Sequence, residues 1–246
     1  MVRLCSLLLF AFLTVLFSGE APLAATEREA ILAGYRNQLA VLDRAIAESP
    51  QQVSLFSQRG DRRLFLGQFA GAVADFEKMI ALDPAQDAPH WRLGIAYYFA
   101  AQFAKSARQF EKYHAYDGGD RENGLWKFLG DCKTMDRAAA QKAMLVYTRF
   151  DREPFPALYE LFAGRRTTAE FFTDLTARKL KDDPRVMFFA HYYAGLHEEL
   201  LGHRTQALEL LHAAVANRWG QTAENGPAYM WQVARLHFET LAAATP

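Results

Sequence analysis

Residues 60–84 read GDRRLFLGQFAGAVADFEKMIALDP, and residues 94–118 read GIAYYFAAQFAKSARQFEKYHAYDG. The two stretches begin 34 residues apart and place their glycines, aromatic residues and acids alike, so that Gly60 and Phe76 correspond to Gly94 and Phe110. Repetition at such a period is typical of proteins that stack one supersecondary unit many times.

Each copy predicts two helices joined by a tight turn. Apolar or small residues recur at steps of three and four, which is the period of a helix face, and Gly67 interrupts the pattern once. Pro84 ends the second helix. The small residues Gly60 and Ala72 allow close helix approach, and Phe76 fills the space beside them. One hairpin cannot bury its apolar face alone, so the period predicts a solenoid of stacked hairpins.

A third copy lies near the C-terminus, where Gly195 and Leu211 take the places of Gly60 and Phe76. The interval between the second and third copies has room for two hairpins of weaker pattern, and a last helical pattern follows the third copy. The predicted organisation is clear repeats at 53–86, 87–120 and 188–221, degenerate hairpins at 121–150 and 155–184, and a capping helix at 226–243.

The repeat resembles the tetratricopeptide repeat. The first copy matches that family's pattern at Phe56, Gly60, Ala72, Phe76 and Pro84. It departs from the pattern at Arg63, where tyrosine is usual, and at Met79, where alanine is usual. The resemblance implies an all-α, right-handed solenoid of about five helix–turn–helix hairpins with a C-terminal capping helix.

The resemblance also implies where a ligand binds, because the first helix of each tetratricopeptide hairpin lines the concave groove. The groove positions predicted for a protein partner are Asp61, Leu64, Trp91, Ile95, Tyr98, Tyr192 and Leu196. A surface of this aromatic and apolar kind suits an extended peptide or an amphipathic helix. The alternative is that Trp91 and Tyr98 pack against a neighbouring hairpin or against the N-terminal segment, since aromatic residues at helical spacing are usually core.

The first 25 residues have the pattern of a signal peptide. Arg3 precedes an apolar run from Leu4 to Phe17, which as a helix would span roughly 21 Å against the about 30 Å of a bilayer core. Small residues up to Ala25 follow the run, so we predict cleavage there, a mature chain of 26–246, and an exported, periplasmic or secreted protein without stable membrane insertion. A short uncleaved anchor is the alternative. Cys5 lies at the start of the apolar run, whereas a lipoprotein signal needs a cysteine after it.

The charge balance argues against nucleic acid and anionic membrane surfaces as partners. The chain carries 28 Lys and Arg against 28 Asp and Glu, so its formal net charge is zero. Proteins that bind phosphate backbones carry an excess of positive charge.

One segment raises the possibility of a metal site, HYYAGLHEELLGH at 191–203. A zinc-protease helix needs His-Glu-x-x-His, but position 201 is Leu, and His191 and His197 fall on different faces of one helix. Phosphate loops and nucleophile elbows are also missing. The sequence therefore predicts no catalytic residues, no metal, no cofactor and no enzymatic activity.

The order of the repeats further resembles the NlpI-like periplasmic tetratricopeptide adaptors. That likeness implies an adaptor, often dimeric, that docks cell-envelope hydrolases and a protease; the missing lipoprotein cysteine departs from it. The sequence thus favours a non-enzymatic exported scaffold that binds a peptide or helix of a protein partner. Two alternatives stay open: a self-associating structural module such as a homodimer, and an accessory protein with a spatially assembled catalytic or metal site.

Overall fold

The structure is a computed structural model that describes residues 23–244. That part of the chain contains helices and no strand, which confirms the predicted all-α fold. The predicted leader lies outside the described residues apart from 23–25. The helices are α1 (Ala25–Glu48), α2 (Val53–Phe65), α3 (Phe69–Leu82), η1 (Pro84–Gln86), α4 (Trp91–Phe99), α5 (Phe103–Tyr116), α6 (Arg121–Asp131), α7 (Arg137–Lys142), α8 (Phe155–Phe162), α9 (Thr168–Ala177), α10 (Pro184–Leu200), α11 (Arg204–Ala216), α12 (Arg218–Thr222) and α13 (Gly226–Ala243).

Three pairs of consecutive helices, α2/α3, α4/α5 and α10/α11, approach each other at a glycine. A Cβ atom added to Gly60 would lie only 2.5 Å from the Phe76 ring, which confirms the predicted close approach. The same contact recurs in the other two pairs, at 2.6 Å from Gly94 to Phe110 and at 2.9 Å from Gly195 to Leu211. No real Cβ tolerates these distances, so the glycines set the helix spacing.

The turns inside these three pairs share a left-handed residue. Gly67 has φ +76° and Gly202 has φ +78°. Ala101 occupies the same place in the second pair with φ +57°, although its side chain disfavours that conformation. The turn geometry is thus common to all three pairs.

The middle of the chain departs from prediction in one helix. The second helix of the hairpin predicted over 121–150 is α7, which ends already at Lys142. The residues that follow, up to 150, form no helix or strand, and Tyr147 packs its ring against Tyr159 at a centroid distance of 5.2 Å. A Cβ on Gly124 of α6 would lie 2.6 Å from the Tyr147 hydroxyl, so Tyr147 packs on α6 at a residue that has no side chain.

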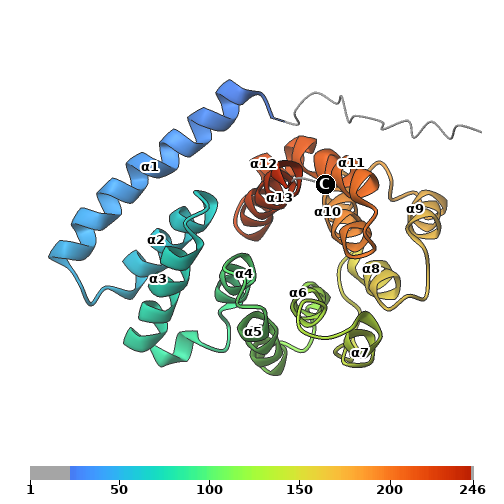
Figure 1. Ribbon diagram of the computed structural model, residues 1–246, viewed down its shortest axis with the longest axis horizontal. Helices are drawn as coiled ribbons and strands as arrows, with labels where there is room; N and C mark the ends of the chain where they lie inside the picture. Colours follow the sequence, from blue (N-terminus) through green and yellow to red (C-terminus); the bar gives the residue numbers. More distant parts are fainter. Residues whose placement is uncertain (1–22, 245–246) are drawn as a thin grey trace, which may run out of the picture.

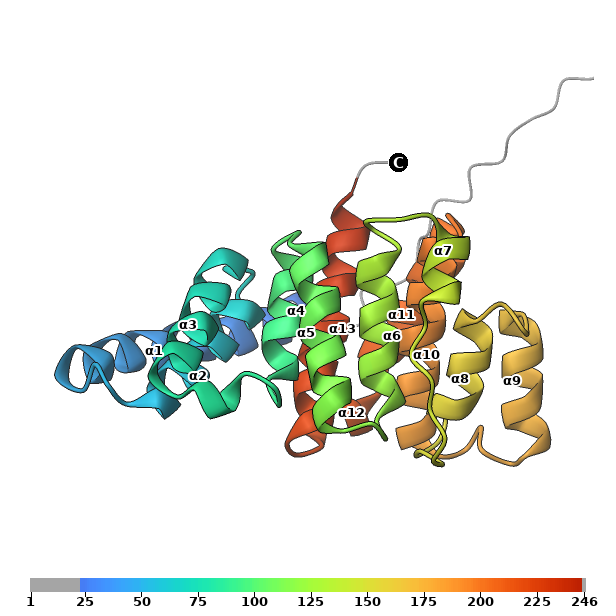
Figure 2. The ribbon, with the colours of Figure 1, turned by 90° about the horizontal axis from the view of Figure 1, so that it is seen from below.

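The helices from α2 to α9 follow an arc, and α13 lies inside it (Figure 1). The view from below shows α13 running behind α4, α5 and α6 (Figure 2). Ion pairs join the start of α1 to the C-terminal part, from Arg28 to Glu239 and from Arg218 to Glu27, both at 2.7 Å. The last helix was predicted to cap the end of the array. It packs on α11 and α12, the preceding helices of the array, and it also lies inside the arc and reaches α2.

Candidate functional site

Helix α13 packs on the side chains that were predicted to line an open groove. The Tyr229 ring lies edge-on to Trp91 at a centroid distance of 4.8 Å. The His237 ring lies 5.7 Å from that of Tyr98. Aromatic pairs at these distances are core-like contacts. The hollow of the arc therefore holds a helix of the same chain.

The seven predicted groove residues fall into two sets. Four are buried with at most 2% of their surface exposed: Leu64, Ile95, Tyr192 and Leu196. Asp61, Trp91 and Tyr98 are half-buried. A partner has access to the first set only if α13 moves, whereas Trp91 also lines an open cavity.

The contact of Tyr192 with α13 is polar. Its hydroxyl oxygen lies 2.7 Å from Nδ1 of His237. Complete burial lowers the pKa of His237 to about 3, so the imidazole is neutral at pH 7. This pair fixes α13 against α10 inside the fold.

Asp61 is held by a neighbouring helix. Its Oδ2 accepts a hydrogen bond of 2.6 Å from Nη1 of Arg92 on α4. Burial raises the pKa of Asp61 to about 6 in spite of this guanidinium. Asp61 also borders a shallow hollow of about 540 Å³ that includes Trp91 and Tyr229.

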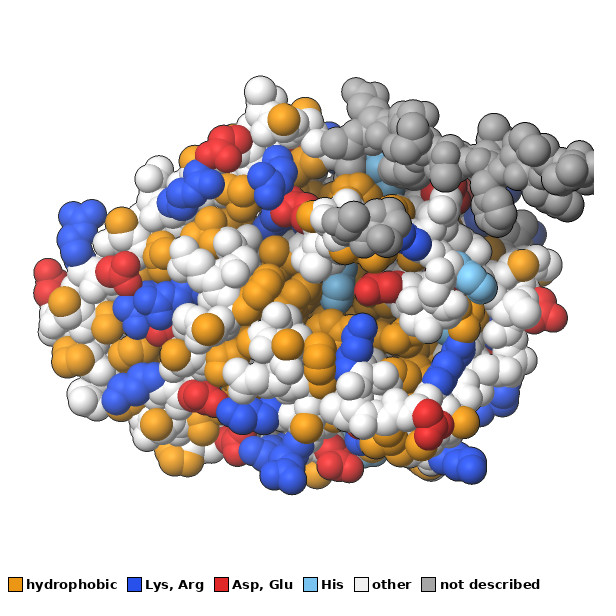
Figure 3. All heavy atoms as spheres, in the orientation of Figure 1, with side chains coloured by type: hydrophobic (Ala, Val, Ile, Leu, Met, Phe, Trp, Pro, Cys, Tyr) orange, Lys and Arg blue, Asp and Glu red, His pale blue; other side chains and the backbone are white. Residues whose placement is uncertain are grey.

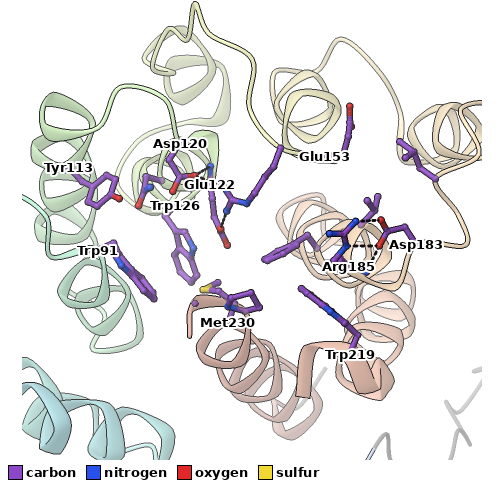
Figure 4. Close-up of a pocket in the computed structure, with 17 residues that line it drawn as sticks. Trp91, Tyr113, Asp120, Glu122, Trp126, Glu153, Asp183, Arg185, Trp219 and Met230 are labelled. Atoms are coloured by element: carbon purple, nitrogen blue, oxygen red, sulfur yellow. Dashed lines mark hydrogen bonds and ion pairs between the residues drawn. The ribbon is translucent and has the colours of Figure 1, made fainter. Parts of the chain in front are cut away.

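A larger cavity of about 640 Å³ opens on the other side of Trp91. It lies among the N-terminal ends of α4, α6, α10 and α13, the segment before α8, and α12. Figure 4 shows Trp91 and Trp126 on one side and Trp219 on the other. The lining residues are Trp91, Tyr113, Asp120, Glu122, Asn123, Trp126, Arg152, Glu153, Leu180, Asp183, Arg185, Val186, Phe189, Trp219, Gly226, Pro227 and Met230. The volume is that of a typical ligand pocket.

A chain of hydrogen bonds runs along the inner wall of this cavity. Nε1 of Trp126 donates to the Tyr193 hydroxyl at 3.0 Å, and this hydroxyl donates to Oε1 of Glu122 at 2.6 Å. The other carboxylate oxygen of Glu122 accepts from Arg152. Burial, the largest cause, raises the pKa of Glu122 to about 7, and Arg152 opposes that rise only in part.

The Arg152 guanidinium contacts three acidic side chains at the cavity. Its Nη1 lies 3.2 Å from Asp120 and 3.4 Å from Asp151, in addition to the pair with Glu122. Its guanidinium lies over the Phe155 ring, 4.2 Å from the centroid. Such stacking and pairing hold the planar group in one orientation.

Glu122, Arg152 and Trp219 are not among the site residues that the sequence predicts. Glu122 comes from a degenerate hairpin, Arg152 from a segment outside any helix, and Trp219 from a five-residue helix at the end of the third repeat. The groove positions predicted from the clear repeats therefore do not include them. Asp120 and Asp183 did carry a local signal, because each caps a helix by accepting a backbone N–H two residues later.

The histidine-rich segment at the end of α10 forms a separate cluster, in which His197 and Glu198 are buried and His203 is exposed. Glu198 accepts a hydrogen bond from Thr168, and its other oxygen lies 2.6 Å from Nδ1 of His203. Nε2 of His197 lies 2.9 Å from a guanidinium nitrogen of Arg137, and burial lowers the pKa of this histidine to about 4. Over residues 23–244, no three His, Cys, Asp or Glu side chains converge as a metal site would require.

No protein-family model matches the chain, and no curated protein matches it in sequence. Within the described part of the chain, every helix is too short or too polar to cross a membrane. The chemistry of the site therefore rests on its own geometry.

Proposed function

We propose that this protein is an exported, non-enzymatic tetratricopeptide scaffold that docks a segment of a protein partner. The observation that carries the proposal is the aromatic cavity of about 640 Å³ beside Trp91, to which the ends of several separate helices contribute. Tryptophan and tyrosine supply much of the binding energy at protein interfaces. Because α13 fills the hollow of the arc, the partner segment enters this cavity rather than the whole groove.

The tetratricopeptide assignment is supported by the repeated glycine contact. Gly60, Gly94 and Gly195 each face a large side chain sixteen residues later, with left-handed turn residues between the helices.

A docking face is supported by the surface of the molecule. In Figure 3, hydrophobic side chains gather over the middle of the face that is shown, and many charged side chains lie around them.

The non-enzymatic part of this proposal is supported by the hydrogen bonds and ion pairs that the titratable groups form. Glu198 and His203 bond to each other, and Arg152 bonds to three acids, so these groups already serve structural contacts. The export of the protein is supported by the apolar pattern of residues 4–17. Cell-envelope hydrolases and proteases are the partners that the NlpI-like resemblance suggests.

A crosslinked pull-down from the native exported fraction tests the proposal. The protein is compared with Trp91→Ala and Trp219→Ala variants, and with Val41→Ala as a control at an exposed position on α1. Circular dichroism first establishes that all four proteins are folded. A partner that the wild type and the control capture, and both tryptophan variants lose, supports the proposal. Equal capture by all four proteins refutes this docking site.

A second candidate function, self-association, is favoured by a different surface. Val146 and Phe150 in the segment after α7 are 79% and 78% exposed, and Tyr116 at the end of α5 is 65% exposed. Arg149 lies 3.7 Å from Asp117 and brings this segment to the end of α5. Exposed apolar side chains gathered in this way often mark an interface. Sedimentation measures this function as a molecular mass that rises with protein concentration. The function is favoured if the mass rises for the wild type and does not rise for the double variant Val146→Ser with Phe150→Ser.

A further inference from the structure

The acids around Arg152 are more numerous than the cations. Asp120, Glu122 and Asp151 all contact this one guanidinium, so there is a surplus of two negative charges when all three acids are ionised. The guanidinium of the neighbouring Arg121 faces the Tyr147 ring instead. A carboxylate cluster that is desolvated and under-compensated attracts a further cation.

The other charged groups of the cavity are balanced. Asp183 pairs with Arg185 at 2.8 Å, and Glu153 pairs with Arg178. The N-terminus of α6 contributes about half a positive charge near Asp120, which offsets only a quarter of the surplus. The negative charge is thus concentrated at one point of the wall.

The aromatic rings complete a site for a cation. Trp91, Tyr113, Trp126, Phe189 and Trp219 line the same cavity. Ring faces attract guanidinium and ammonium groups, and indole does so best. An anion would meet the surplus carboxylates, and a neutral ligand would leave their charge uncompensated.

We propose that this cavity binds the basic side chain, arginine or lysine, of a segment of the partner protein. The inference rests on the proposed scaffold function and specifies the chemistry of its partner. The aliphatic stem of the side chain lies between Trp91 and Trp219, and its charged end approaches Glu122 and Asp120. This binding mode explains why a peptide site contains both tryptophans and surplus acids.

Binding of a cation is coupled to a proton at Glu122. The groups that face its carboxylate are Arg152 and Asp151 from the segment before α8, Asp120 at the start of α6, and Tyr193 from α10. The pKa of Glu122 is raised to about 7, so the side chain is about 10% ionised at pH 6 and about 90% ionised at pH 8. A cation that needs the ionised form binds up to about tenfold more tightly at pH 8.

NMR of the indole N–H groups tests this inference with arginine amide as the probe. We expect saturable shifts of the Trp91 and Trp219 signals, with a dissociation constant on the order of millimolar. Trp231 is an internal control, because its Nε1 donates to the Val215 carbonyl at 2.9 Å in the core. Citrulline amide has the same shape without the charge, and we expect it to bind at least tenfold more weakly at equal ionic strength.

Two variants separate the charge from the fold. Glu122→Gln should bind arginine amide at pH 8 about as weakly as the wild type does at pH 6, with no further change between these pH values. Glu160→Gln, on an exposed pair with Arg165, should behave as the wild type. Should Glu122→Gln not fold, Trp219→Ala must weaken binding at both pH values.

Three results would overturn the inference: equal binding of citrulline amide, no pH dependence in the wild type, or shifts with the neutral sugar chitobiose in place of arginine amide. The pull-down distinguishes these failures from failure of the proposed function. A partner that the tryptophan variants lose, without arginine amide binding, leaves the scaffold function intact and refutes the basic side chain. Arginine amide binding with full partner capture by both variants refutes the partner assignment.

Discussion

Arg235 on α13 donates a hydrogen bond of 2.7 Å from Nη2 to the backbone carbonyl of Phe65 at the end of α2, across 170 residues of sequence. The guanidinium is 2% exposed and also bonds to Gln232 and Glu239. The Phe65 carbonyl is one of the groups at a helix C-terminus that lack a partner within their own helix. Helix α13 therefore supplies a backbone partner to the first hairpin and is a structural part of the arc.

Replacement of Arg235 by Ala should lower the free energy of unfolding by about 3 kcal/mol, because it leaves the Phe65 carbonyl without its partner and opens space in the core. Urea unfolding followed by circular dichroism measures the change. The matched control is Arg36→Ala at an exposed ion pair with Glu29, where we expect a change within about 0.5 kcal/mol. Equal stability of the two variants would show that α13 contributes no such bond.

Replacement of Gly94 by Ala should destabilise the protein by about 1–3 kcal/mol. The added Cβ would lie 2.6 Å from the Phe110 ring, so the two helices of the pair must separate or the ring must move. Gly34→Ala in α1 is the control, because no atom lies within 4 Å of its added Cβ. There we expect a gain of about 0.5–1 kcal/mol from helix propensity.

The combination of Gly94→Ala with Phe110→Leu extends this prediction. The smaller side chain gives the new methyl group room, so the double variant should be more stable than the sum of the two single changes implies. Thermal unfolding of the wild type, the two single variants and the double variant completes this double-mutant cycle. Strict additivity would mean that the glycine and the phenylalanine do not set the helix spacing.

The turn inside the second helix pair contains a residue whose replacement should stabilise the protein. Ala101 has φ +57°, whereas glycine occupies this place in the other two pairs. Ala101→Gly should stabilise the protein by up to about 1 kcal/mol, because glycine adopts a left-handed conformation without a Cβ penalty. Gly67→Ala should destabilise by a similar amount, since its φ is +76°. Melting temperatures that change in the same direction for both variants would contradict the argument.

The fold class and the helix spacing could be predicted because they depend on local signals. Gly60 and Phe76 lie sixteen residues apart in one hairpin, so periodicity alone brings them together. The end of α7 at Lys142 could not be predicted, because the residues after it keep an apolar pattern and a tertiary contact of Tyr147 decides their conformation. Long-range packing overrides local pattern at such places.

The candidate site could be predicted only in part, for the same reason. Trp91 was identified from its repeat position, and it does line a cavity. The burial of Leu64 and Ile95 was not foreseen, because the location of α13 inside the arc follows from contacts such as Arg235 with Phe65. Arg152 lies between two predicted hairpins, and Trp219 lies at the end of the third repeat, away from its predicted groove positions.

The buried His237 makes stability depend on pH. Burial lowers its pKa from 6.5 to about 3, so the folded state binds fewer protons than the unfolded state between these pH values. The stabilisation is fully present above about pH 6.5 and is lost as pH falls toward 3. His237→Gln keeps a polar contact for Tyr192 but does not titrate.

The stability difference between the wild type and His237→Gln should therefore change with pH. From pH 6 to pH 5 the wild type should lose about 1 kcal/mol relative to the variant, as measured by urea unfolding at each pH. Comparison with a variant is needed because Glu122 acts in the opposite direction: its pKa of about 7 means that the fold gains stability as this carboxyl becomes protonated. Gly94→Ala changes no titratable group, so its cost should stay constant over the same range. A constant difference for His237→Gln as well would mean that the pKa of His237 is the same in the folded and unfolded states.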